Sequence, residues 1–430
     1  MSSTSADNQL LESEYESTPI PADKRKSLFS NSMVWVGFPM IITSAVTGAT
    51  IVHGLGFSKG LTAIVLGNLL LFLYVGLLSM LGAKYGINFS MLATRTFGKK
   101  GYAVSSILLS TLVVGWFAVQ TGLTGVSMES AFGSNPVTIA LIAGILYVLL
   151  TLVGIRALSF IGMISAPLFF LIAIYAAVEA ARGGGSAWDY QGTGTGLSIG
   201  AAVTLVFALF ADSGTMTADF TRWAKNQKHA VIATFSAFPL ATAFAMIMGG
   251  FIAAVSGGGG DVFGVIAEKG GIFGIIAVLF LFVNLGSVCS HCLYNAAVGW
   301  SYILGGRMRM LTLILGVIGT GVAALGVWDY FVNWLNLLGV IVPPIGAVII
   351  IDQFLVRRNL EESRALRIKP FIAWAIGSTA ALIVHYEFPS LSVAVAGIIV
   401  SAAAYLVISL GDMKAANEAS TPARPVKTNA

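Results

Sequence analysis

The stretch ALFADSGTMTADF, Ala208–Phe220, places an aspartate among small polar residues in the middle of an apolar segment that runs from 197 to 221. Such a segment is long enough to cross the hydrocarbon core of a bilayer, which takes about 20 residues of helix. A charged side chain at the centre of a spanning helix costs about 2.5–3.5 kcal/mol on insertion scales, so such residues usually face a cavity, a partner or an ion path. We therefore expect Asp212 to lie where the protein carries out its function.

The composition requires a lipid environment for the chain. Of the 430 residues, 57% are hydrophobic and 10% are charged, and the mean hydropathy is +0.87. These values exclude an ordinary soluble globular protein. The apolar runs are continuous rather than alternating, which predicts helices instead of the strands of a barrel. The sequence predicts an all-α integral membrane protein with 12 transmembrane helices, near residues 30–56, 60–83, 102–128, 136–155, 158–181, 197–221, 228–255, 272–304, 310–328, 330–356, 370–387 and 390–410.

The basic residues predict the orientation of the chain, because Lys and Arg stay preferentially on the cytoplasmic side of a membrane. With the N-terminus inside, 21 of the 24 Lys and Arg residues fall on the cytoplasmic side, and only Lys59, Arg182 and Lys269 fall on the other. We expect a multi-pass protein of the cell inner (plasma) membrane with both termini in the cytoplasm. This topology explains the net charge of +5 without a nucleic-acid partner.

Two of the apolar segments are interrupted in comparable ways. Gly37 and Pro39 lie in the middle of the first, and Asp212 to Thr215 lie in the middle of the sixth. Proline removes a backbone donor and clashes with the preceding turn, and short polar residues favour turns over helix, so both helices are predicted to be discontinuous. Gly and Pro are also common in membrane helices whose neighbours repair the backbone. The matched positions and the acid favour the functional interpretation.

The spacing of the two breaks predicts an internal repeat. Breaks in segments one and six are expected when spans one to five recur, inverted, as spans six to ten, an arrangement in which secondary transporters hold the substrate and the coupling ion near the midplane. We place repeat one at about 27–182, repeat two at about 196–356 and two peripheral helices at about 370–410. This transmembrane domain, 27–412, lies between a cytoplasmic N-terminal tail, 1–26, and a cytoplasmic C-terminal tail, 413–430.

Three roles are open for Asp212. Its carboxyl group can carry a proton, and it can accept hydrogen bonds from the amino groups of a substrate. It can also cap the second half of the broken helix by accepting from the amides after Ser213. These roles do not exclude one another.

Two aromatic residues are candidates for binding a planar ring. Trp116 lies in the middle of the third span rather than at the membrane interface, where tryptophan is usually found, and Gln120 lies one turn further on the same face. Phe210 comes two residues before Asp212 and is expected to form the opposite wall of an aromatic slot. The alternative for each ring is ordinary core packing.

The eighth span carries a polar stripe. Asn284, Ser287 and His291 are spaced i, i+3 and i+7, which places them on one face of a helix that must point inward. His291 is expected either to relay protons or, as we favour, to bond a neighbouring carbonyl. Cys289 and Cys292 form a C-x-x-C on the same helix. Without a second pair they are better explained by close helix packing than by a metal or redox site.

At these residues the sequence resembles the nucleobase:cation symporter family, which contains the cytosine permease and the hydantoin transporter. The resemblance covers nearly the whole length and is closest to the cytosine permease-like branch. It implies the five-plus-five inverted repeat with discontinuous helices 1 and 6 and two extra helices. The motifs that carry it are GNLLLFLYVGLLSMLGAKYGI (67–87), VGWF (114–117), SGTMTADFTRW (213–223), NLGSVCSHCLYNAAVGW (284–300) and PPIGAVIIIDQFL (343–355).

The resemblance also implies a substrate site. In the cytosine permease branch a tryptophan of span three and a phenylalanine of span six enclose the ring, and an asparagine of span eight hydrogen-bonds it. Trp116, Phe210 and Asn284 match these positions. The backbone beside the break in span six, here at Asp212 and Ser213, contributes further groups.

The same branch implies a sodium site made of span-one carbonyls and span-eight oxygens, and this chain departs from the family pattern at two positions. The matching positions of the ion site are Gly37, Met40, Asn284, Ser287 and Val288. Val288 replaces a hydroxyl residue of the ion site. Val113 replaces a glutamine that the family carries one turn before the tryptophan.

We expect a secondary active transporter that imports a small planar nitrogenous compound, cytosine or a related ring, by symport with Na⁺ or H⁺ and without another cofactor. An alternative is a proton-coupled carrier of an amidine- or amine-bearing compound that uses Asp212. A third hypothesis is a membrane enzyme or receptor that uses Asp212 and His291 as an acid/base pair, although no nucleophile or complete metal set accompanies them. The expected partners are this small-molecule substrate and the lipid bilayer.

Overall fold

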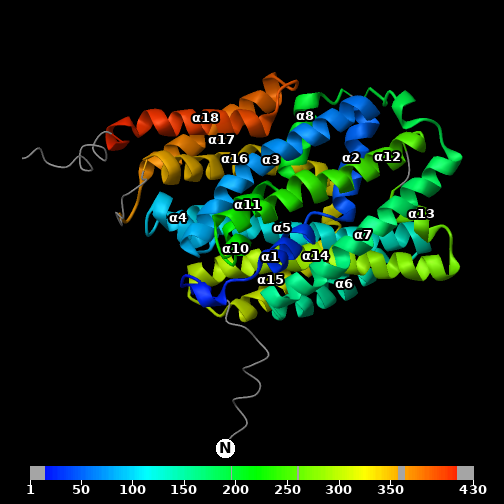
Figure 1. The fold of residues 1–430 in the computed structure, drawn as a ribbon, viewed down its shortest axis with the longest axis horizontal. Coiled ribbons are helices and arrows are strands. Elements are labelled where there is room, and N and C mark those ends of the chain that lie inside the picture. Colours follow the sequence, from blue (N-terminus) through cyan, green and yellow to red (C-terminus); the bar gives the residue numbers. More distant parts are fainter. Residues whose placement is uncertain (1–14, 195, 259–260, 357–363, 414–430) are drawn as a thin grey trace, which may run out of the picture.

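Long apolar segments of this chain form long helices, because a backbone in lipid must satisfy its own hydrogen bonds. The computed structural model describes residues 15–194, 196–258, 261–356 and 364–413, and within these ranges the fold is helical apart from a single parallel bridge between Lys26 and Ala224. The helices lie side by side in one bundle (Figure 1). This confirms the all-α membrane fold.

Seven helical stretches in the described residues are long and apolar enough to cross a membrane. They are α3 (Phe57–Tyr85), α5 (Tyr102–Phe132), α7 (Ile155–Gly183), the stretch Gln227–Val255, α14 (Gly271–Leu304), the stretch Val327–Val356 and α17 (Ile368–Glu387). Five shorter apolar helices accompany them: α2 (Ile42–Leu55), α6 (Pro136–Leu152), α8 (Ile199–Ala208), α15 (Met308–Ala324) and α18 (Val393–Ile408).

Two of the long stretches contain a wider, π-helical segment that the sequence did not lead us to expect. The stretch Gln227–Val255 consists of α11 (Gln227–Phe235), the π-helix η4 (Ser236–Thr242) and α12 (Ala243–Val255), and Pro239 lies in its π-helix. The stretch Val327–Val356 consists of η5 (Val327–Tyr330), α16 (Phe331–Ile351) and the π-helix η6 (Asp352–Val356). The remaining short elements are η2 (Ala22–Lys24), α1 (Leu28–Val36), α4 (Phe89–Phe97), η3 (Ala187–Asp189), α9 (Ala211–Thr215), α10 (Ala218–Thr221) and α13 (Gly264–Ala267).

Both predicted interruptions are present. The first helix stops at Val36 and restarts at Ile42, and the hydroxyl of Ser44 donates to the carbonyl of Pro39 at 2.7 Å. The sixth segment is interrupted twice rather than once, after Ala208 and again after Thr215. The first segment is interrupted at the predicted Gly37 and Pro39, whereas in the sixth segment the predicted residues Asp212 to Thr215 form α9 and the interruptions lie on either side of them.

Close backbone contacts replace side-chain packing between α2 and α12. A Cβ added at Gly48 would overlap the carbonyl of Met246, and one added at Gly249 would overlap the carbonyl of Ala45. Small residues permit this approach in membrane helices, where van der Waals contact rather than the hydrophobic effect holds helices together. The second half of the first broken helix is therefore held against α12.

The helices α17 and α18 lie along one edge of the bundle, and α6 and α15 lie along the opposite edge (Figure 1). The inner elements α1, α5, α10 and α14 lie between them. The broken segments and the polar stripe of α14 therefore meet in the interior, where their polar groups are shielded from lipid.

Basic side chains and part of the N-terminal segment pack together at one end of the bundle. Arg222 donates to the carbonyl of Tyr15 at 2.8 Å, and the backbone N–H of Lys26 donates to the carbonyl of Trp223 at 2.7 Å. Arg25 donates to a carbonyl at the end of α3, 2.8 Å away. Residues 15–26 thus pack on the helices around Arg222 and Trp223.

A buried ion pair joins α17 to the end of α16. Asp352 accepts from Arg367 through both carboxylate oxygens at 2.9 Å, and Tyr405 of α18 donates to it at 2.6 Å. The Asp352 side chain has no exposed surface, and that of Arg367 is 10% exposed. The guanidinium also donates to the carbonyl of Thr96 in α4 at 2.7 Å, so one pair ties four helical elements together.

We expect Asp352→Ala to destabilise the protein by about 3–5 kcal/mol, because it leaves the Arg367 guanidinium buried without its counter-ion. A matched control is the pair Lys369–Asp412, also 2.9 Å apart but with both side chains about 40% exposed. Asp412→Ala should cost at most about 1 kcal/mol. Thermal unfolding of the purified variants in detergent micelles measures both, and equal shifts would contradict the prediction.

Candidate functional site

The two broken segments meet through aromatic rings. Phe38 lies between the glycine and the proline of the first break, and its ring contacts that of Phe210 edge to face at 5.3 Å. The other face of Phe38 stacks on His291 of α14 at 5.1 Å. Phe210 also contacts Phe238 of η4 at 5.7 Å. The first break, the first interruption of the sixth segment and the middle of α14 therefore form one buried cluster.

The polar stripe of α14 holds the first break in place. The Asn284 amide donates to the carbonyl of Met40 at 2.9 Å and to the hydroxyl of Ser165 at 3.1 Å, and its oxygen accepts from the N–H of Ile42 at 2.8 Å. Ser287 donates to the carbonyl of Gly37 at 2.7 Å. An unwound backbone leaves peptide groups without helical partners, and here two side chains of one helix satisfy them.

These bonds bring together the four positions expected to hold a sodium ion: Gly37, Met40, Asn284 and Ser287. The two carbonyls and the hydroxyl are hard oxygen ligands of the kind that such a cation prefers, but each carbonyl already accepts a hydrogen bond from α14. Val288 is buried beside them and offers no oxygen. An ion would have to replace these hydrogen bonds and would find fewer side-chain oxygens than the family pattern provides.

Asp212 is fully buried in α9, directly after the first interruption of the sixth segment. Its Oδ1 accepts from the backbone N–H of Ser213 at 2.7 Å, whereas its Oδ2 has no hydrogen-bond partner among the described residues. The Trp116 indole N–H is directed toward this carboxylate without completing a hydrogen bond of normal geometry. The capping interpretation requires the amides after Ser213, but Asp212 accepts only from Ser213 itself and α9 has no side-chain cap; one carboxylate oxygen remains available.

The two rings expected to enclose a planar substrate have different neighbours in this conformation. Trp116 is 2% exposed and its ring contacts Phe331 of α16 edge to face at 6.1 Å. Phe210 contacts Phe38 and Phe238 instead. Enclosure of a ring between Trp116 and Phe210 therefore remains a prediction.

Gln120 and His291 are both tied to neighbouring groups. Gln120 accepts a hydrogen bond from the hydroxyl of Thr43, which links α5 to the start of α2. His291 Nδ1 lies 2.6 Å from the carbonyl of Ser287, so the ring donates to that oxygen. This is the bond to a neighbouring carbonyl that the sequence favoured for His291.

Cys289 packs against α5, and Cys292 on the same helix is buried. Cys289 Sγ lies 3.6 Å from the hydroxyl of Thr121 and 3.8 Å from the carbonyl of Phe117. Among the described residues, no group of three or more His, Cys, Asp or Glu side chains is arranged to hold a metal ion. These contacts agree with a packing role for the cysteine pair.

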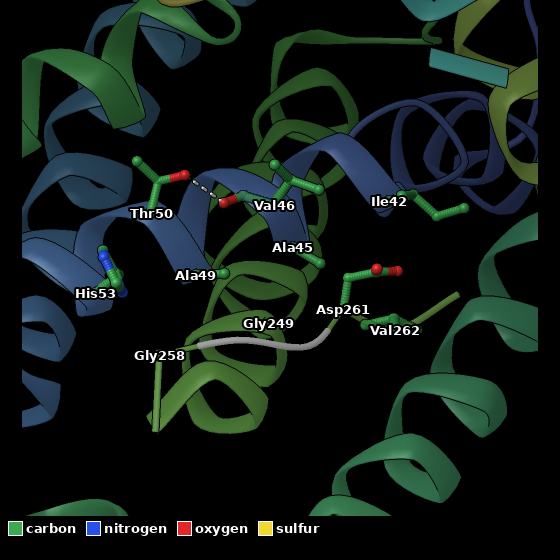
Figure 2. A pocket seen from close by; sticks show the side chains of 10 residues that line it. All are labelled: Ile42, Ala45, Val46, Ala49, Thr50, His53, Gly249, Gly258, Asp261 and Val262. Atoms are coloured by element: carbon green, nitrogen blue, oxygen red, sulfur yellow. Dashed lines mark hydrogen bonds between the residues drawn. The ribbon is translucent and has the colours of Figure 1, made fainter. Parts of the chain in front are cut away.

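Figure 2 shows a cavity of about 300 Å³ beside α2. Its lining residues are Ile42, Ala45, Val46, Ala49, Thr50, His53, Gly249, Gly258, Asp261 and Val262. Trp116, Phe210 and Asp212 are not among them, and the link to the first break is Ile42, whose N–H binds Asn284. The cavity adjoins one end of the first break and does not coincide with the expected substrate position.

Sequence reasoning missed several residues of this region. Ser165 of α7 and Thr43 of α2 bond the two amides, Asn284 and Gln120, and Phe38 connects the breaks. Phe38 stands between Gly37 and Pro39 and had a local signal, since an aromatic residue at a helix break cannot avoid the interior. A serine or threonine in an apolar helix carries no such signal.

The chain is similar in sequence to known permeases. The family model described as "Permease for cytosine/purines, uracil, thiamine, allantoin" matches residues 19–384. The cytosine permease of Escherichia coli (strain K12) is 32% identical over 351 residues, which cover 81% of this chain and 83% of that protein. The hydantoin permease of Microbacterium maritypicum is 22% identical and covers 79% of this chain and 75% of its own length.

The fold has solved counterparts. Mhp1, a nucleobase-cation-symport-1 family transporter in a closed conformation with bromovinylhydantoin bound, superposes with a TM-score of 0.78 at 20% identity, covering 94% of this chain and 96% of that one. A Na⁺-coupled sialic acid symporter gives a TM-score of 0.71 at 13% identity, covering 94% and 93%. At these identities the likeness establishes the fold alone. The chain belongs to the family of permeases for cytosine/purines, uracil, thiamine and allantoin, and it is a membrane transporter rather than an enzyme.

Proposed function

We propose that this protein imports a small planar nitrogenous compound, cytosine or a related nucleobase-like ring, by cation symport with alternating access. The observation that carries the proposal is the buried carboxylate of Asp212, which keeps one oxygen without a partner among the described residues and lies beside the indole of Trp116 at a helix break. A flat ring stacks on an indole, and its amino group donates to a carboxylate. The name of the Escherichia coli relative supports cytosine as the first compound to test.

The arrangement in the membrane is part of the proposal. We propose 12 spans, with both termini in the cytoplasm of a cell whose inner (plasma) membrane holds the protein. Repeat one occupies about 27–182 and repeat two about 196–356, with two peripheral helices after them. The position of α17 and α18 at one edge of the bundle supports the last point (Figure 1). Alternating access then moves one group of helices against the other around the two breaks.

The coupling ion is either Na⁺ or H⁺. Sodium is favoured by three hard oxygen ligands that lie close together: the carbonyls of Gly37 and Met40 and the hydroxyl of Ser287. Asp212 favours a proton, because a buried carboxylate without a counter-ion can be neutralised by taking one up. The second candidate function, a proton-coupled carrier of an amidine- or amine-bearing compound, rests on the same carboxylate.

Counterflow in proteoliposomes tests the proposal. Purified protein is reconstituted with unlabelled cytosine inside, and entry of labelled cytosine is followed against competing uracil, hydantoin and benzamidine, with and without sodium and at two pH values. Exchange of cytosine confirms the substrate class. If cytosine does not exchange, the same assay with benzamidine as the labelled and trapped compound tests the second candidate, and no exchange of either compound would overturn both.

A further inference from the structure

Asn295 is a buried amide for which the part of the chain that the structure describes provides no hydrogen-bond partner. It lies on α14 with no exposed surface, and neither its Oδ1 nor its Nδ2 has a hydrogen-bond partner among the described residues. Asn284 on the same helix makes three hydrogen bonds, and Asn31 and Asn68 each make at least one. Buried polar groups are almost always paired, so an exception calls for a functional explanation.

The neighbours of Asn295 along the helix show where its side chain points. One turn earlier, Cys292 lies within electrostatic range of the Asp212 carboxylate, and His291 stacks on Phe38. One turn later, a Cβ at Gly299 would overlap the hydroxyl of Ser110 on α5 and lie 3.7 Å from the end of Met216, which follows α9. Residues three and four apart share a helix face. Asn295 therefore faces the space between α5 and the interrupted sixth segment.

The level of Asn295 in the bundle follows from the antiparallel packing of α5 and α14. Cys289 of α14 contacts Phe117 of α5. Gly299, ten residues after Cys289, contacts Ser110, seven residues before Phe117. Between these two contacts, Asn295 lies at the level of Val113. Val113 is buried and has no polar side-chain atom, and Trp116 lies one turn beyond it on the side of Asp212.

We propose that Asn295 is a substrate-binding residue that reads the edge of the transported ring. A primary amide presents a donor beside an acceptor, and so do the edges of nucleobases, which asparagine binds with both groups. The ring would stack on Trp116, bind Asp212 on one side and present its donor and acceptor atoms to Asn295. At this level α5 offers only the apolar side chain of Val113, so α14 supplies the amide. The inference rests on the proposed function.

Moving the amide from α14 to α5 tests this directly. Asn295→Leu should weaken equilibrium binding of labelled cytosine to the purified transporter by about tenfold or more, since the lost pairing leaves the ring edge unsatisfied. Adding Val113→Gln to Asn295→Leu should recover at least part of that loss. Asn68→Leu, the control, removes a buried amide that bonds Ile64 and Met246 and should change cytosine affinity less than threefold.

The melting temperature of the ligand-free variants provides an independent readout. Asn295→Leu should melt at the same or a higher temperature than the wild type, because an unpaired buried amide stabilises nothing, whereas Asn68→Leu should melt lower. Unchanged cytosine affinity in Asn295→Leu, or a lower melting temperature without recovery by Val113→Gln, overturns the inference. If wild-type protein binds no cytosine, the proposed substrate fails instead, and the melting temperatures still decide whether Asn295 has a structural role.

Discussion

Trp116→Ala is expected to weaken cytosine binding roughly 5- to 150-fold. Stacking of a base on an aromatic side chain contributes about 1–3 kcal/mol per base, and each 1.4 kcal/mol corresponds to a factor of about ten in affinity. Trp116 is the indole next to the Asp212 carboxylate, and the variant removes that stacking surface. Equilibrium binding of labelled cytosine in detergent measures the effect.

Trp188 provides the matched control. Its side chain is 64% exposed and its ring contacts Phe57 at 5.0 Å, and it lies in η3, outside both broken segments. Trp188→Ala should leave the affinity within about twofold of the wild type. If Trp116→Ala binds cytosine as well as Trp188→Ala does, Trp116 is not part of the site.

Asp212→Asn is expected to abolish accumulation of substrate driven by a proton gradient and to weaken binding, because an NH2 group replaces the acceptor Oδ2, while exchange persists at saturating cytosine. Asparagine has nearly the same shape and still accepts a hydrogen bond from Ser213 N–H, but it cannot take up a proton. Proteoliposomes with an acidic outer buffer should accumulate labelled cytosine through the wild type, whereas the variant should only equilibrate it. Counterflow in the same vesicles shows that the variant is folded and binds.

Asp261→Asn is the control for this experiment. Asp261 Oδ1 accepts from the backbone N–H groups of Phe263 and Gly264 at 2.8 and 2.9 Å, and an amide oxygen can do the same. Its accumulation should match that of the wild type. Undiminished proton-driven accumulation in Asp212→Asn would remove the carrier role and leave capping and substrate binding for that carboxylate.

The positions of the breaks could be predicted because their cause is local. Gly37 and Pro39 lie within the first break, and Asp212 lies within the interrupted part of the sixth segment, so sequence neighbours suffice to locate both regions. The inward face of α14 followed from the spacing of Asn284, Ser287 and His291. That the sixth segment is interrupted twice, on either side of Asp212 to Thr215, could not be predicted, because those residues indicated a single break.

The use of each polar group could not be predicted because it depends on which neighbouring helix comes within reach. Asn284 was expected to bind substrate, yet in this conformation Met40, Ile42 and Ser165 engage its amide. Asn295 belongs to the same inward face, and only the three-dimensional packing shows that it has no hydrogen-bond partner among the described residues. Helix rotation and register decide such matters, and periodicity fixes them only to about a quarter of a turn.

The glycine contacts between α2 and α12 constrain how the transporter can change shape. Because Gly48 and Gly249 press main chain against main chain, separating the two helices would open a void in lipid. They should travel as one piece during a transport cycle. Spin labels at Thr50 and Ser256 would then report a constant separation under every ionic condition, which makes this pair a fixed reference for measuring the motion of other helices.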